Sequence, residues 1–126
     1  MNIPAVARDE ATEEFFDGTA AGEYLIRRCE PHDHASKPQV VQCSVCGSED
    51  LRWEPASGHA TLVSWAVLPP PASAVVAVAE LAEGPWIWAS LVCDDPSLLR
   101  EGMGLRIAFE RPPGSEAIPV LVPATA

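Results

Sequence analysis

The sequence is poor in positive charge and has no long apolar run. Eight Lys and Arg residues stand against 18 Asp and Glu residues, which gives a formal net charge of −10 at pH 7. Nucleic acid is a polyanion that proteins bind mainly through Lys and Arg, so this balance argues against nucleic acid as the main partner. No run approaches the roughly 20 apolar residues that cross a bilayer, and residues 1–14 lack the pattern of a secretory signal. We therefore expect a cytoplasmic protein without a membrane span.

Long helices are also disfavoured by the composition. The 126 residues include 13 prolines and eight glycines, which favour short strands and turns. One short helix is expected between Asp9 and Gly22, with Thr12 as its N-cap and Gly22 as its C-terminal stop. Gly18 weakens the helix interior, so this helix must dock on the rest of the chain or on a partner.

Short strands are predicted over most of the remaining chain. One strand is expected at 23–28, before a turn-rich segment that extends to residue 50. Residue alternation and β-branched content then predict five strands, at 60–68, 73–81, 86–92, 105–110 and 118–122. The strand at 86–92 places Trp86 and Trp88 on one face and Ile87, Ala89 and Leu91 on the other. Five short antiparallel strands in this length fit an OB-fold barrel.

The turn-rich segment contains a metal-binding pattern. Its spacing is Cys-Glu-Pro-His, ten residues, then Cys-Ser-Val-Cys-Gly. Two-residue gaps let each ligand pair wrap one face of a tetrahedral ion, and thiolates with an imidazole select zinc. Four protein ligands leave no open position, so the site is expected to be structural, with one zinc per chain. The predicted ligands are Cys29, His32, Cys43 and Cys46, with His34 as the alternative to His32 for the fourth position.

The roles of several other residues are predicted on less specific patterns. Arg27, Arg28 and Lys37 lie close enough in sequence to form a phosphate-binding patch, or they are scattered cations on an acidic surface. We interpret His34 as a solvated loop residue and Cys93 as a small core residue.

Groups for autonomous catalysis are few. The histidines are His32, His34 and His59, and two of them lie in the metal segment. The sequence has no Ser-His-Asp order, no phosphate loop and no open metal site. We therefore predict that the chain has no catalytic residue of its own. Since aromatic anchors carry much interface energy, the candidates for partner contacts are Phe15, Phe16, Trp86 and Trp88.

Several short motifs occur together in a specific order. They include Gly22-Glu23-Tyr24-Leu25, the metal segment, Ser57-Gly58 before Thr61-Leu62-Val63-Ser64-Trp65, Asp94-Asp95-Pro96, and Ile118-Pro119-Val120. In this order the chain resembles an acyl-CoA-associated family with a rubredoxin-like zinc ribbon and an OB-fold domain, formerly a domain of unknown function. The family usually has Cys-x-x-Cys-Gly in its first knuckle, where this chain has His32-Asp33.

The resemblance implies a domain division and a function. It implies an N-terminal helical segment at 1–23, a zinc ribbon at 24–53 and a five-stranded OB-fold domain at 54–126. It also implies an accessory subunit of a thiolase-like or lipid-transfer-type partner, or of a hydratase, that acts on acyl-CoA. Such complexes include aldolases (lyases) that cleave a steroid side-chain acyl-CoA by a retro-aldol reaction. The CoA phosphates would meet Arg27, Arg28 and Lys37.

Two alternatives to an acyl-CoA subunit stay open. OB folds and zinc ribbons often bind single-stranded nucleic acid, and Trp65, Trp86 and Trp88 are able to stack on bases. A purely structural scaffold subunit that never touches CoA is the other alternative.

Overall fold

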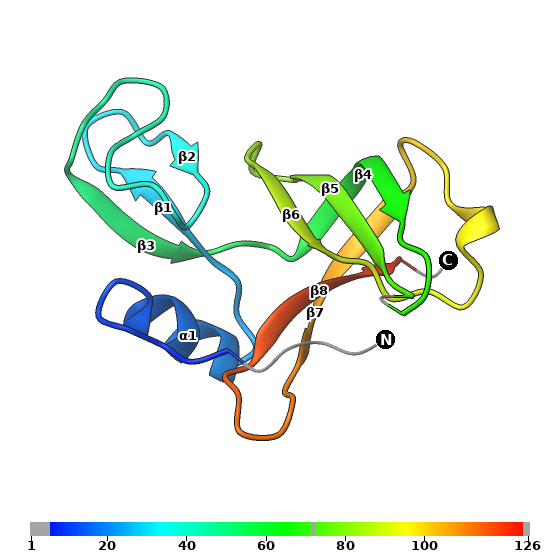
Figure 1. The fold of residues 1–126 in the computed structure, drawn as a ribbon. Helices are drawn as coiled ribbons and strands as arrows, with labels where there is room; N and C mark the ends of the chain where they lie inside the picture. The colour runs from blue at the N-terminus through cyan, green and yellow to red at the C-terminus, as the bar shows by residue number, and fades with distance from the viewer. Residues whose placement is uncertain (1–5, 72, 125–126) are drawn as a thin grey trace.

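A computed structural model describes residues 6–71 and 73–124, which form two antiparallel sheets and one α-helix (Figure 1). The helix is α1 (Glu13–Ala20). The smaller sheet has the order β2-β1-β3, with β1 (Leu25–Cys29), β2 (Ala35–Ser36) and β3 (Leu51–Pro55). The larger sheet has the order β6-β5-β4-β7-β8. Its strands are β4 (His59–Val67), β5 (Val75–Leu81), β6 (Trp86–Ser90), β7 (Gly104–Glu110) and β8 (Ile118–Pro123). The prediction of a mainly β protein is confirmed.

The larger sheet curls into a half-barrel. A register shift in β4, between Leu62 and Ser64, bends that strand against β5. The chain leaving β6 then reaches the opposite edge strand, β8. Leu91 forms a parallel bridge with Leu121, and the Val92 backbone N–H donates to the Leu121 carbonyl over 2.8 Å. This contact brings the two ends of the five-stranded sheet together, in agreement with the predicted OB-type architecture.

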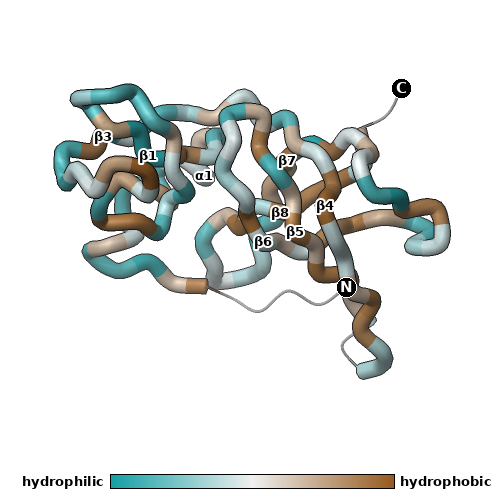
Figure 2. The backbone as a smooth tube through the Cα atoms, turned by 90° about the horizontal axis from the view of Figure 1, so that it is seen from above, coloured by the Kyte–Doolittle hydropathy of each residue, from teal (hydrophilic) through white to brown (hydrophobic). Residues whose placement is uncertain are grey.

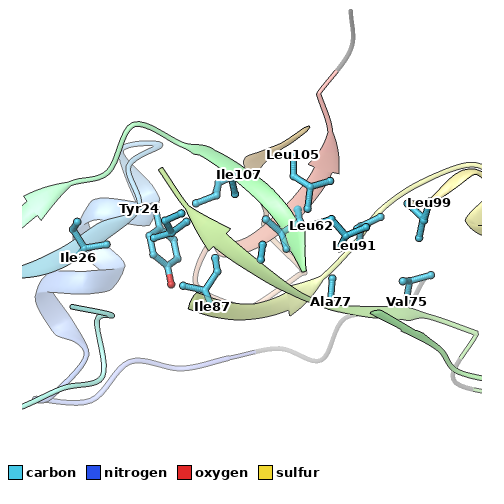
Figure 3. Packing of buried hydrophobic residues seen from close by; sticks show 14 residues of the cluster. Tyr24, Ile26, Leu62, Val75, Ala77, Ile87, Leu91, Leu99, Leu105 and Ile107 are labelled. Atoms are coloured by element: carbon cyan, nitrogen blue, oxygen red, sulfur yellow. The ribbon is translucent and has the colours of Figure 1, made fainter. Parts of the chain in front are cut away.

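One apolar core fills the barrel and extends into the smaller sheet. Period-two alternation puts every second side chain of β4, β5 and β7 inside. At the junction, Tyr24 lies between Ile26 of β1 and the barrel residues Ile87 and Ile107 (Figure 3). Its backbone carbonyl also accepts the N–H of Ala56, over 2.8 Å. The ribbon is therefore attached to the barrel through shared packing.

The ribbon has little apolar core of its own. Among the described residues from 25 to 55, the buried ones are Ile26, Cys29, Ser36 and Cys43. Figure 2 shows hydrophilic stretches over much of the ribbon loops, whereas the barrel strands are largely hydrophobic. Burial of so few apolar groups cannot offset the chain entropy of about 30 residues. The ribbon therefore depends on its junction with the barrel.

The helix α1 begins after Thr12, as predicted, but the Thr12 side chain does not cap it. Its hydroxyl bonds instead to the backbone N–H and carboxylate of Asp9, each over 2.9 Å. The end of the helix agrees with the prediction. Gly22 adopts φ +80, and the Glu23 N–H donates to the Gly18 carbonyl over 2.8 Å.

Sequence reasoning missed three elements. The two-residue β2 and the 3₁₀ helix η1 (Pro96–Leu98) are too short to give a periodic signal. The third element, β3, pairs with β1 from Leu25↔Pro55 to Cys29↔Leu51 and so closes the ribbon. Among the described residues, no helix is long and apolar enough to cross a membrane.

Gly18 is more than a weak point of the helix. A Cβ at this position would lie 2.6 Å from Leu25 Cγ, so the glycine allows α1 to approach β1. We expect Gly18→Ala to lower the free energy of unfolding by about 1–2 kcal/mol, because overpacking outweighs the better helix propensity of Ala. Chemical denaturation measures this change. The matched control is Gly104→Ala, whose Cβ would have an ordinary contact of 3.6 Å. Equal stability of both variants would contradict the packing role.

Candidate metal centre

The two predicted ligand pairs lie on turns of the same backbone geometry. In the first, the Asp33 N–H donates to the Cys29 carbonyl over 2.8 Å, and in the second the Gly47 N–H donates to the Cys43 carbonyl over 2.9 Å. The fifth residue matches too, since the carbonyls of His34 and Ser48 accept the N–H groups of Cys29 and Cys43. The first turn is thus a complete knuckle, although its sequence departs from the second.

Asp33 occupies the position that Gly47 has in the second knuckle. Their φ angles are 61° and 76°, in the left-handed region that favours glycine. Asp tolerates this region better than most residues, which explains how the knuckle forms without a glycine. His32 thereby takes the position that corresponds to Cys46.

The side chains of both knuckles converge on one point of the ribbon. The ligand atoms of Cys29, His32, His34 and Cys46 all lie within 4.8 Å of one another. The sulfurs of Cys29 and Cys46 are 3.9 Å apart. Two thiolates on one tetrahedral zinc, each about 2.3 Å from the ion, lie roughly 3.8 Å apart. The residues present therefore fit a zinc ion.

Cys43 joins this group through His34. Its sulfur lies 3.6 Å from His34 Nδ1, within hydrogen-bond reach of that ring nitrogen, although Cys43 is not one of the four residues of the cluster. Hydrogen bonds from the Cys46 and Val45 backbone N–H groups, with a smaller contribution from His34, lower the pKa of Cys43 to about 6. These hydrogen bonds therefore favour the thiolate form of Cys43, the form that binds metal.

His34 is the residue that sequence reasoning undervalued. The sequence favours a solvated loop residue over a ligand here, but His34 is half-buried and stacks on His32 with ring centroids 5.6 Å apart. The four clustered donors and the adjacent Cys43 thus give five candidate ligands for the four positions of a tetrahedral ion. The short His-x-His spacing indicates that either histidine is a possible ligand, but spacing alone does not tell which ring points to the cluster.

Two arginines of the ribbon sheet hold the first knuckle. Arg28 donates through Nη1 to the Asp33 carbonyl over 2.8 Å and pairs with Glu54 over 2.5 Å. Arg52 pairs with the Asp33 carboxylate over 2.9 Å and with Glu30 over 3.2 Å. Arg28 and Arg52 are opposite each other on β1 and β3, so one face of the sheet presents both guanidinium groups.

The three predicted CoA-phosphate candidates do not gather into one patch. Arg27 and Arg28 are neighbours on β1, so their side chains point to opposite faces of the sheet. Arg28 is paired with Glu54, whereas Arg27 lies over the Trp53 ring at 4.2 Å from its centroid. Lys37 is exposed directly after β2. Phosphate binding by these residues stays a prediction.

The four aromatic candidates for partner contacts differ in exposure. Phe16 is buried within this chain, and Phe15 is half-buried with edge contacts to Phe16 and Tyr24, each at a centroid distance of 5.4 Å. Trp86 and Trp88 are 54% and 75% exposed on the edge strand β6. The predicted separation of the two faces of this strand is confirmed, because Ile87 is buried.

Comparison with known sequences relates the chain to one protein family. Residues 53–110 match the family model described as ChsH2, C-terminal OB-fold domain. A DUF35 domain-containing scaffold protein of Pyrococcus furiosus is 29% identical over 91 residues. That match covers 67% of this chain and 66% of the relative, just under two thirds of its length.

Comparison with solved structures agrees with this relation. A chain of the Ltp2-ChsH2(DUF35) aldolase is 29% identical, with a TM-score of 0.79 over 98% of this chain and 100% of that chain. A DUF35-family protein of unknown function from Sulfolobus solfataricus has a TM-score of 0.62 over 78% of this chain and 77% of that chain. At 13% identity, the second match supports the fold alone. The predicted family resemblance is confirmed.

We expect the purified chain to bind about one zinc, with His32 as the fourth ligand because it corresponds to Cys46. Relative to the wild type, His32→Ala should weaken zinc affinity by at least about tenfold and His34→Ala by less than about threefold, because only the first removes a ligand. Competition with a chelator measures these affinities, and Co²⁺ substitution reports the sulfur and nitrogen ligands by visible absorption. A larger loss in His34→Ala would assign the fourth position to His34.

The two arginines should contribute unequally to metal retention. The Arg52 pair with Asp33 is largely exposed and is expected to contribute little. Arg28 is less exposed and binds the knuckle backbone directly. We expect Arg28→Gln to weaken zinc affinity by about tenfold and Arg52→Gln by less than about fivefold. Arg106→Gln, on an exposed position of β7, is the charge-matched control and should have no effect. A larger loss of zinc affinity in Arg52→Gln than in Arg28→Gln would contradict this assignment.

Proposed function

The chain is a DUF35- and ChsH2-like protein, and we propose that it acts as an accessory subunit of an acyl-CoA aldolase (lyase) complex. In this proposal a thiolase-like or lipid-transfer-type partner carries the catalytic residues, and the reaction is a retro-aldol cleavage of a steroid side-chain acyl-CoA. The observation that carries the proposal is the match to a chain of the Ltp2-ChsH2(DUF35) aldolase, because it extends over 98% of this chain. The scaffold description of the Pyrococcus furiosus relative supports the same role.

The zinc site supports a structural rather than a catalytic contribution. Three cysteines and a histidine would fill a tetrahedral ion, which leaves no position for a water or a substrate. Such an ion holds the two knuckles together and so fixes the shape of the ribbon. The chemistry of the complex is therefore proposed to occur on the partner.

The exposed face of β6 is the proposed partner surface. Trp86 and Trp88 lie on one side of this edge strand, and Val78 of β5 is directly opposite Trp88 on the same face. Large exposed aromatic side chains at a sheet edge are typical of protein interfaces.

A nucleic-acid module is the less favoured alternative. The Trp86 indole N–H donates to the Glu80 carboxylate over 3.3 Å, so an acidic group lies beside the ring that would stack on a base. The negative charge of this carboxylate repels a phosphate backbone, and the net charge of −10 acts in the same direction.

Whether the chain itself contacts CoA separates an active accessory role from a pure scaffold. Substituting Arg27 and Arg28 by Ala should weaken acyl-CoA binding by the complex if these residues meet the CoA phosphates. Because Arg28 also holds the first knuckle, zinc content must be measured on the same variant. Unchanged acyl-CoA affinity with intact zinc would favour the scaffold role.

The proposed interface predicts the behaviour of the complex. We expect the tagged chain, co-expressed with the products of its neighbouring genes, to co-purify with a thiolase-like protein. Trp86→Ala and Trp88→Ala should each weaken this complex by about thirtyfold, the effect of losing a hot-spot residue of about 2 kcal/mol. Leu98→Ala removes another exposed apolar side chain, 69% exposed on η1, and serves as the control. Full retention of the partner by both Trp variants would place the interface elsewhere.

A further inference from the structure

A groove lies between α1 and the ribbon, on the side of the sheet opposite the two paired arginines. It has a volume of about 580 Å³ and is lined mainly by apolar groups. Phe15 and Phe16 of α1 form one wall, and the loop at 38–41 forms the other, with Val41 83% exposed. Arg27 and Trp53 complete the lining. The volume is within the range of about 300–1,000 Å³ that small-molecule sites occupy.

Arg27 contributes the one charged side chain among the residues that line this groove. Its guanidinium lies over the Trp53 ring, and its Nη2 donates to the Leu51 carbonyl over a long 3.4 Å. Its Nε is buried without a hydrogen-bond partner, and no carboxylate among the described residues forms an ion pair with it. A buried donor without an acceptor is costly, and a guanidinium suits a carboxylate in particular.

The neighbouring Arg28 differs from Arg27 because it has acidic and backbone acceptors. On the other face of the same strand, Arg28 is paired with Glu54 and with the backbone of Asp33. The chain has 18 acidic residues, so acceptors for a guanidinium are not scarce. Arg27 instead has an aromatic ring on one side and an apolar groove beside it.

From this geometry we propose that the groove binds an amphiphile with an aliphatic body and a single carboxylate head. The head accepts hydrogen bonds from Arg27, and the body lies along Phe15, Phe16 and the loop at 38–41. Binding covers Val41 and gives the Arg27 guanidinium a charged acceptor, so both apolar burial and a charge-assisted hydrogen bond favour it. This site goes beyond the proposed subunit role and needs no partner protein.

The test uses the zinc-loaded full chain and decanoate below its micelle concentration. Decanol, with the same body and no charge, is the matched ligand. We expect saturable binding of one decanoate per chain, seen by calorimetry and by a change in Trp53 fluorescence that Trp53→Phe abolishes. Decanol should bind at least about tenfold more weakly, because it lacks the charge-assisted hydrogen bond. This comparison requires no variant of Arg27.

Variants then locate the head of the ligand. Arg27→Gln should lower decanoate affinity by about tenfold and leave decanol affinity within about twofold. Arg106→Gln, which removes an exposed arginine from β7, should leave both unchanged. Phe15→Ala should weaken both ligands, since it shortens the apolar wall. Equal binding of decanoate and decanol by the wild type, absence of saturable binding, or equal effects of the two Arg variants would overturn the proposal.

Discussion

The position of the ribbon depends on the packing of Tyr24. This residue immediately precedes β1, and its ring is buried between Ile26 on the ribbon side and Ile87 and Ile107 of the barrel. Burial also raises the pKa of its hydroxyl. Because the ribbon buries so few apolar groups, it has no independent core on which to fold. The junction thus anchors one end of the ribbon, and the knuckles are left to organise the other.

Backbone hydrogen bonds and ion pairs of the two knuckles organise the end of the ribbon that lies away from the junction. The two turns share the same hydrogen-bond pattern although only one contains a glycine. In the other, Asp33 adopts the left-handed conformation and its carboxylate meets Arg52, while Arg28 binds its carbonyl. These ion pairs are partly exposed, so each contributes modestly. Their combined effect is to hold His32 near Cys29 and Cys46, where a bound metal ion would contribute further stability.

The two faces of β1 therefore serve different purposes. One face uses its arginine within the chain, to brace the first knuckle. The other directs Arg27 to an apolar groove, where no carboxylate of the described residues pairs with it and its Nε has no acceptor. A third surface, the exposed Trp86 and Trp88 of β6, belongs to the barrel and not to the ribbon. The proposed metal, ligand and partner sites thus lie on separate surfaces, which allows each proposal to be tested by its own variants.

Local patterns were sufficient for the barrel strands and the limits of α1, because periodicity and turn residues depend on neighbours within a few residues. Ligand spacing predicted the two ligand pairs, and the structure places Cys29, His32 and Cys46 in one cluster with His34. They also placed Trp86 and Ile87 on opposite faces of one strand. Other features needed the folded chain. His34 enters the metal cluster only because the first knuckle turns its ring toward Cys43, and Gly18 is required only because α1 packs on Leu25. The separation of Arg27 from Arg28 follows from strand pairing, and the groove at Arg27 arises from contacts between segments distant in sequence, which no local pattern encodes.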